Sequence, residues 1–137
     1  MIQVIAGKKG SGKTKRIIDM ANVASRDSKH DIVFIDDDAR YMYDLRHEVR
    51  FINAGEYELA SDQMFMGFLC GIVSQNFDLG LIFIDAFKKL FKAELSTSEW
   101  LFERLETISK NHSVDFVLSI SEGEEELPAF IQKYVQH

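Results

Sequence analysis

Short, mostly apolar runs alternate along this chain with longer segments whose apolar residues recur every three or four positions. Runs of this kind, bounded by glycine or charged residues, are typical of strands that are buried on both faces of a sheet. They predict five strands, at residues 2–6, 32–35, 49–52, 81–84 and 114–120.

The longer segments predict helices, and some of them carry signals for a helix start. Ser61 can cap a helix that runs to about Gln75, and Ser96 with Glu99 has the form of a capping box that opens a helix to about Lys110. Pro128 stands near the first turn of a terminal helix, where proline is tolerated. The complete set of predicted helices is 13–24, 39–47, 61–75, 96–110 and 127–135.

Strands that alternate with helices predict an α/β fold of the three-layer α/β/α kind, with a mostly parallel sheet of about five strands. At 137 residues we expect one domain, residues 1–137. The strand order stays open. The apolar content of strand 2–6 favours an interior position, whereas insertion of strand 114–120 between it and strand 81–84 would leave it at an edge.

Composition and charge narrow the classes of function. Apolar residues make up 46% of the chain and charged residues 28%, as in packed globular domains. The net charge of −6 argues against a nucleic-acid partner.

The longest apolar stretch, residues 64–73, is about half of what a membrane-spanning helix needs. No secretory signal pattern opens the chain, so we expect no membrane span and a cytoplasmic location. The lone Cys70 lies among apolar neighbours and is expected in the core.

The stretch that separates strand 2–6 from helix 13–24 reads GKKGSGKT and matches the Walker A pattern G-x-x-x-x-G-K-[ST] at every fixed position. Glycines let the backbone wrap an anion, and the following helix directs its positive end at the same point. Lys13 can reach the β and γ phosphates, and the Thr14 hydroxyl can ligate Mg²⁺. The predicted cofactors are ATP and Mg²⁺, and the predicted nucleotide-binding residues are Gly7, Lys8, Lys9, Gly10, Ser11, Gly12, Lys13, Thr14 and Lys15.

Such a loop needs an acidic partner for the metal, at the end of a buried neighbouring strand. Asp85 ends strand 81–84 and is the predicted second metal residue beside Thr14, while Asp36 and Asp38 at the end of strand 32–35 compete for that duty. Ser119 and Ser121, at the end of strand 114–120, are candidates to contact the γ phosphate. The four glutamates at 122–126 are interpreted as a solvated acidic turn rather than a metal site.

These residues resemble those of the P-loop NTPases, with partial similarity to the ParA/MinD-like branch that has a deviant Walker A motif. In that branch a signature lysine follows the first glycine, as Lys8 does here, and an aspartate pattern ends the second strand, as Asp36 and Asp38 do in FIDDDAR. The resemblance implies catalytic roles for Lys13, Asp36 and Asp38, and a homodimer in which Lys8 contacts nucleotide across the interface. Lys9 stands where that branch has a glycine, and no proline follows Asp38. The whole chain also resembles small bacterial proteins known as predicted ATP-binding proteins.

The sequence therefore predicts an ATP-binding protein, a slow or partner-stimulated Mg²⁺-dependent ATPase that acts as a nucleotide switch. No glutamate follows Asp85 to activate water, and the guanine motif N-K-x-D does not occur. One alternative is a small nucleoside or nucleotide kinase, for which Arg40, Arg46 and Arg50 are the available phosphate clamps. Another is an interaction module that binds nucleotide without hydrolysing it.

Overall fold

The computed structural model describes residues 1–90 and 93–136, and these residues form an α/β fold on a five-stranded parallel sheet. The strands are β1 (Ile2–Ala6), β2 (Asp31–Asp36), β3 (Val49–Asn53), β4 (Leu79–Ile84) and β5 (Asp115–Ile120). Every predicted strand is confirmed, with end shifts of one or two residues at most. The sheet order is β1-β5-β4-β2-β3.

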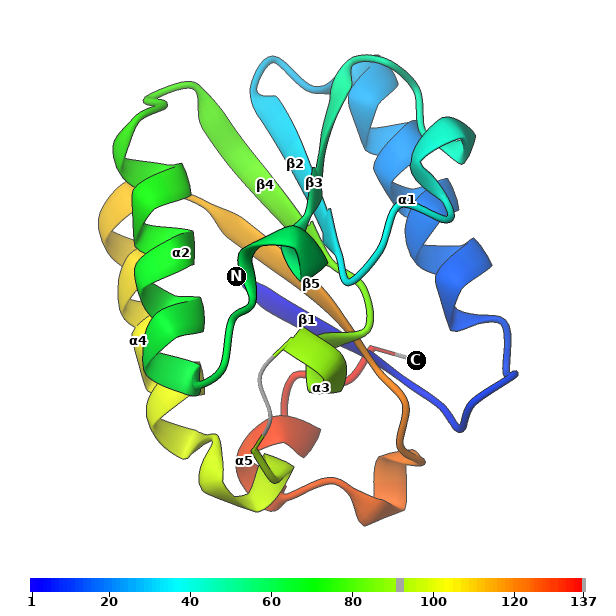
Figure 1. The fold of residues 1–137 in the computed structure, drawn as a ribbon, viewed down its shortest axis with the longest axis vertical. Coiled ribbons are helices and arrows are strands. Elements are labelled where there is room, and N and C mark those ends of the chain that lie inside the picture. The colour runs from blue at the N-terminus through cyan, green and yellow to red at the C-terminus, as the bar shows by residue number, and fades with distance from the viewer. Residues whose placement is uncertain (91–92, 137) are drawn as a thin grey trace.

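The helices cover both faces of this sheet. In the described residues they are α1 (Lys13–Asp27), α2 (Asp62–Ser74), α3 (Phe87–Leu90), α4 (Glu99–His112) and α5 (Ala129–Gln132), with short 3-10 turns at Met42–Asp44, Ala54–Tyr57, Leu95–Thr97 and Glu124–Glu126. Figure 1 shows α2 and α4 side by side on one side of the sheet and α1 on the other. This arrangement is consistent with a three-layer α/β/α fold.

Each face of the sheet has its own hydrophobic core, which explains the continuous apolar runs in the strands. In β2, Val33 and Ile35 pack into the core beneath α2 and α4, while Ile32 and Phe34 pack into the core beneath α1. Successive strand residues point to opposite faces, so a strand covered on both sides has to be apolar at every position. The run that predicted β2 is therefore a direct result of its central place in the sheet.

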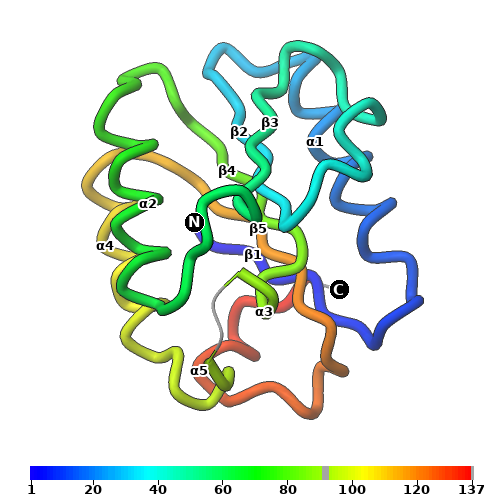
Figure 2. Tube along the Cα trace, viewed as in Figure 1, coloured from blue at the N-terminus to red at the C-terminus, as the bar shows by residue number. Residues whose placement is uncertain are grey.

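The interior position favoured for the first strand is wrong, because β5 lies between β1 and β4 and leaves β1 at the edge. That edge is covered by the C-terminal segment. The N–H of Val4 donates to the carbonyl of Tyr134 at 2.9 Å, and the N–H of Gln136 donates to the carbonyl of Val4 at 3.1 Å. Figure 2 shows this segment, in red, passing beside β1. The apolar content of β1 reflects this cover, and the Leu127–Val135 region is helical only at Ala129–Gln132 because its end serves as the cover.

Two other predictions about helices are corrected. Residues 39–47 form a 3-10 turn at Met42–Asp44 and no α-helix. Side chains take two of their backbone N–H groups: Arg40 N–H donates to Asp38 at 2.9 Å and Arg46 N–H to Asn22 at 2.8 Å. The capping box at Ser96 is also absent. Ser98 is the N-cap residue of α4, and its hydroxyl turns back to donate to the carbonyl of Leu95 at 2.6 Å.

The start of α2 is as predicted, because the Ser61 side chain accepts a hydrogen bond from the N–H of Met64 at 3.1 Å. Cys70, on the same helix, is exposed and does not belong to the core, so that expectation is wrong. Among the described residues, no helix combines the length and apolarity that crossing a membrane would need.

Candidate functional site

The loop of residues 7–12 joins the carboxyl end of β1 to the start of α1 and depends on its glycines. Gly10 and Gly12 have φ angles of 85° and 87°, in the left-handed region that glycine adopts at little cost. A Cβ atom on Gly7 would lie 2.4 Å from the Ser11 hydroxyl oxygen, so a side chain there would force the Ser11 side chain to move. The loop thus curls tightly over the N-terminus of α1.

The N-terminus of α1 has an unusual charge for a helix start. Its N-cap residue, Gly12, has no side chain that could accept hydrogen bonds from the free N–H groups of the first turn. The first turn also holds no acidic residue. Lys13 and Lys15 stand there instead, at the positive end of the helix dipole. Each such cation costs a helix roughly 0.3–1 kcal/mol, and an anion at the same place contributes a similar amount of stabilisation. An anion placed at this end of α1 would therefore be stabilised.

Lys13 lies beneath the loop with 9% of its surface exposed. Its ammonium group donates a hydrogen bond to the carbonyl of Lys8 at 3.0 Å. Burial lowers the pKa of Lys13, and the negative charge of Asp85 opposes that change. The ammonium is held against the loop and is partly buried, so a negative ligand gains more from it than from a lysine in solvent.

Asp85 directly follows β4, is 4% exposed and is bound on both carboxylate oxygens. The Thr14 hydroxyl donates to its Oδ2 at 3.2 Å, and the Ser119 hydroxyl donates to its Oδ1. Ser119 comes from β5, the strand between β4 and β1, and its oxygen accepts the N–H of Ala86 at 3.0 Å. Three elements therefore fix one carboxylate beside the first turn of α1.

Asp36 ends β2 next to Asp85 and is almost fully buried, with 2% exposed. Its Oδ1 accepts the N–H of Asp37 at 2.7 Å, and its Oδ2 has no hydrogen-bond donor within the described part of the chain. Burial is the main cause that raises the pKa of Asp36 to about 8, and the charge of Asp85 adds to it. A carboxyl in this setting keeps its proton more readily than one in water.

A cleft of about 780 Å³ brings these elements together. Its lining comes from the loop and first turn (Lys9, Gly10, Gly12, Lys13, Thr14, Lys15), the flank of α1 (Ile18, Asp19, Asn22), the segment after β2 (Asp36, Asp37, Asp38, Arg40, Tyr41, Asp44) and the ends of β4 and β5 (Asp85, Ala86, Lys89, Ser121). This volume is within the range of small-molecule sites, and clefts at the carboxyl ends of parallel strands are where α/β proteins bind ligands.

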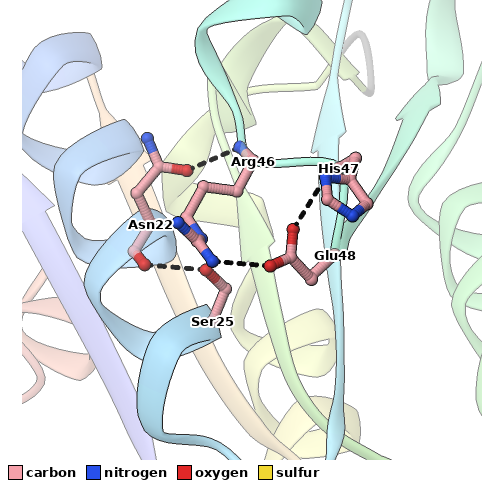
Figure 3. A network of polar contacts seen from close by, with 5 residues as sticks. All are labelled: Asn22, Ser25, Arg46, His47 and Glu48. Atoms are coloured by element: carbon pink, nitrogen blue, oxygen red, sulfur yellow. Dashed lines mark hydrogen bonds and ion pairs between the residues drawn. The ribbon is translucent and has the colours of Figure 1, made fainter.

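One wall of the cleft is hydrogen-bonded to α1 through the side chain of Asn22. Asn22 donates from Nδ2 to the carbonyl of Asp44 at 3.0 Å and accepts the N–H of Arg46 on Oδ1 at 2.8 Å. Figure 3 shows the contact between Asn22 and Arg46 together with two neighbouring pairs. Arg46 donates to Glu48 at 2.6 Å, and His47 lies 3.0 Å from the same carboxylate. The segment from Asp36 to Arg46 is thus held in place without forming a helix.

The acidic turn is attached to the loop, which goes beyond the solvated role predicted for it. Gly7 N–H donates to the carbonyl of Glu122 at 2.8 Å, and the Glu122 carboxylate bonds the ammonium of Lys88. The bond from Lys88 lowers the pKa of Glu122. Lys8, whose side chain is 73% exposed, lies 3.7 Å from the Glu126 carboxylate. The turn therefore supports the back of the loop.

Most of the predicted site residues meet at this cleft. Three loop residues, Gly7, Lys8 and Ser11, do not line the cleft, and neither do the candidate phosphate contacts Ser119, Arg46 and Arg50. Sequence reasoning missed Asn22, Asp37 and Lys89. Helical spacing offered a signal for the first of these, since Asn22 lies seven residues after Lys15 and therefore on the same flank of α1.

No protein-family model matches this chain, and a search of curated proteins finds no significant match. The functional argument therefore depends on the motif and on the geometry of the cleft.

Proposed function

We propose that this protein binds ATP with Mg²⁺ and hydrolyses it slowly or on stimulation by a partner, as a nucleotide-dependent switch of the P-loop type. One observation carries the proposal. The N-terminus of α1 is uncapped and positively charged, and it lies against a buried carboxylate, Asp85, that Thr14 contacts. An anion site beside a metal-binding carboxylate is what a metal–polyphosphate ligand requires.

The phosphates would occupy the curve of the loop, where the free N–H groups of the first turn point. Lys13 would then exchange its bond to the Lys8 carbonyl for a bond to a phosphate oxygen. This exchange replaces a neutral acceptor by a charged one, and charge-assisted hydrogen bonds are about twice as strong as neutral ones. Lys9 and Lys15 line the same end of the cleft and add positive potential.

The residues beside the loop fit Mg²⁺, which prefers oxygen ligands and retains several waters. Thr14 offers a hydroxyl and Asp85 a carboxylate whose other oxygen is held by Ser119. A hydrogen bond to the far oxygen of a metal-binding carboxylate orients that carboxylate and affects metal affinity. When bound, Mg²⁺ neutralises phosphate charge and fixes the orientation of the phosphates.

Slow turnover follows from the residue after Asp85. Ala86 occupies that position with a φ of 55°, and it has no group that could take a proton from water. Asp36 and Asp38 line the same cleft and are the proposed groups that position the attacking water. The pKa of Asp36 is raised and the Asp38 side chain is half-exposed, so both activate water less well than a dedicated glutamate would. A partner would speed the reaction by completing the site.

The switch would operate through the segments that follow Asp36 and Asp85, because both meet the ligand and both reach the surface. Lys8 provides a second route. Its side chain is exposed and its only ion pair among the described residues, with Glu126, is long at 3.7 Å, so it is available to a second copy of the chain or to another protein. A homodimer through Lys8 is thus part of the proposal.

A second candidate, a small nucleoside or nucleotide kinase, is favoured by the length of the cleft. Beyond the aspartates, the cleft continues between α1 and the segment after β2 to Tyr41, Asp44 and Asn22. This extension gives room for a second substrate with a ring and hydrogen-bond donors. Phosphoryl transfer to nucleosides, in place of phosphate release from ATP alone, would identify this activity.

The test is a thermal-shift series with ATP, ADP and GTP, with and without Mg²⁺, followed by turnover and mass measurements with the best ligand. We expect the largest stabilisation with ATP and Mg²⁺ together. Equal melting temperatures with and without nucleotide would overturn the proposal.

A further inference from the structure

We propose that Asp36, Asp37 and Asp38 form a divalent-cation site of their own, separate from Thr14 and Asp85, that binds Mg²⁺, Mn²⁺ or another hard cation without nucleotide. The three residues follow one another where β2 leaves the sheet, and all three line the cleft. Cation binding here does not depend on the proposed function.

The carboxylate oxygens have the spacing of ligands around one ion. One oxygen from each of the three residues lies within 4.8 Å of the other two. Hard cations bind oxygen at about 2.1 Å for Mg²⁺ and up to about 2.6 Å for Ca²⁺, so ligand atoms on opposite sides of one ion lie roughly 4–5 Å apart. The spacing of these three oxygens is therefore compatible with one shared ion.

The second observation is the state of Asp36. Its side chain is buried, and Oδ2 lacks a hydrogen-bond donor in the part of the chain that the structure describes. A buried polar oxygen that is left without a hydrogen-bond partner costs about 1–3 kcal/mol. A cation at the cluster would provide the missing partner for this oxygen.

The side chains around the cluster supply little positive charge to balance its carboxylates. Asp85 faces Asp36 from β4 and adds a further negative charge. Arg40 lies 3.6 Å from Asp38, but its side chain is 69% exposed, and exposed pairs contribute little. Neutralisation by neighbouring side chains is therefore incomplete, and a bound cation would relieve the repulsion among the carboxylates.

The cluster is held on a rigid frame, as a metal site requires. Asp85 N–H donates to the carbonyl of Ile35 at 2.9 Å, which ties the end of β2 to β4. On the other side, a Cβ atom on Gly55 would lie 2.2 Å from the carbonyl oxygen of Asp37. Gly55 is itself fixed by a bond from its N–H to the Asn53 side chain at 3.0 Å. The close packing of Gly55 thus sets the position of Asp37.

The site has a further consequence in the presence of nucleotide, and this part rests on the proposed function. The cluster lies across the cleft from the loop, so a cation there would add positive charge on the side of the phosphates that Lys13 does not reach. Two cations, one at Thr14 and Asp85 and one at the aspartates, would then flank the ligand.

The experiment counts Mn²⁺ bound to the nucleotide-free, full-length protein by electron paramagnetic resonance. The variants are Asp37→Asn and Asp38→Asn, which are both partly exposed, with Asp27→Asn as a control at the exposed end of α1 and Thr14→Ala to remove the other proposed ligand. We expect one bound Mn²⁺ in the wild type, Asp27→Asn and Thr14→Ala, and affinity at least 10-fold weaker in the other two variants.

The proposal is overturned if the folded wild type binds no Mn²⁺. It is also overturned if Thr14→Ala removes the ion while Asp37→Asn and Asp38→Asn retain it, because the ion would then belong to the Thr14 and Asp85 pair. Circular dichroism on each variant shows whether it is folded. Because no nucleotide is present, neither result affects the thermal-shift test for ATP binding.

Discussion

The Ser119 hydroxyl donates a hydrogen bond to the Asp85 carboxylate while it accepts the N–H of Ala86. Ser119→Ala removes the bond to a buried charge, so we expect a loss of about 1.5–3 kcal/mol in unfolding free energy. We also expect the Mg²⁺ concentration needed for ATP-dependent stabilisation to rise about 10-fold or more, because Ser119 would no longer orient the carboxylate that binds the metal. Denaturant unfolding and Mg²⁺ titrations measure the two effects.

Thr107→Ala is the matched control for Ser119→Ala, since it removes a hydroxyl from the exposed side of α4. An unchanged Mg²⁺ requirement in Ser119→Ala would mean that Asp85 does not depend on Ser119 for its orientation.

Lys13→Ala removes the ammonium beneath the loop and should abolish stabilisation by nucleotide. At a ligand concentration of 100 times Kd, the wild type should gain about 2.7 kcal/mol from ATP, and the variant should gain none. Lys13→Met, which keeps an apolar side chain of similar length, should behave in the same way. The exposed Lys29→Ala is the control. Nucleotide stabilisation that persists in both Lys13 variants would show that the ligand binds elsewhere.

Asp36→Asn should make the protein more stable at pH 8, because the wild-type side chain is destabilising there. The pKa of Asp36 is about 8 in the folded protein and 3.8 in the reference state. Between these values the folded state retains a proton that the unfolded state has lost. Stability from this group is therefore complete below about pH 4 and falls as the pH rises to 8.

We expect Asp36→Asn to raise the unfolding free energy at pH 8 by at least about 1 kcal/mol, or roughly 3–5 °C in Tm. The variant should also lose part of the pH dependence between pH 4 and 8. Thermal melts at several pH values, with Asp27→Asn for comparison, provide the measurement. A variant that melts below the wild type at pH 8 would contradict a strained, buried carboxyl at this position.

Asn22→Ala removes both hydrogen bonds that hold the segment at Asp44 and Arg46 against α1. We expect a loss of about 1–3 kcal/mol and faster proteolysis between residues 39 and 48. Asn111→Ala, at an exposed position near the end of α4, should change stability by less than about 0.5 kcal/mol. Equal proteolysis in the two variants would show that Asn22 does not anchor this wall.

Local patterns were enough to predict the strands and the glycine-rich connection. β2 was predicted because both of its faces are buried, and Asp85 was placed correctly at the end of a strand because its apolar run stops abruptly there. The contacts of Asp85 with Thr14 and Ser119 follow from that placement once the strand order is known.

Features that depend on distant parts of the chain were not predictable. Residues 39–47 have an adequate local helix pattern, yet Asn22, more than twenty residues away, takes the backbone groups that a helix would use. The edge position of β1 depends on cover from Tyr134 and Gln136. The pairing of Glu122 with Lys88 likewise joins two residues that are 34 positions apart, so a local sequence pattern does not predict it.

The cover over β1 also affects how this protein behaves in solution. The bonds between Val4 and the segment at Tyr134 and Gln136 occupy backbone groups that would otherwise be open to the strands of neighbouring molecules. A chain cut before Tyr134 would present a bare, apolar strand edge directly before the glycine-rich loop. Such a fragment should aggregate through pairing of its exposed strand edges. It would then precipitate before its ligand binding could be measured.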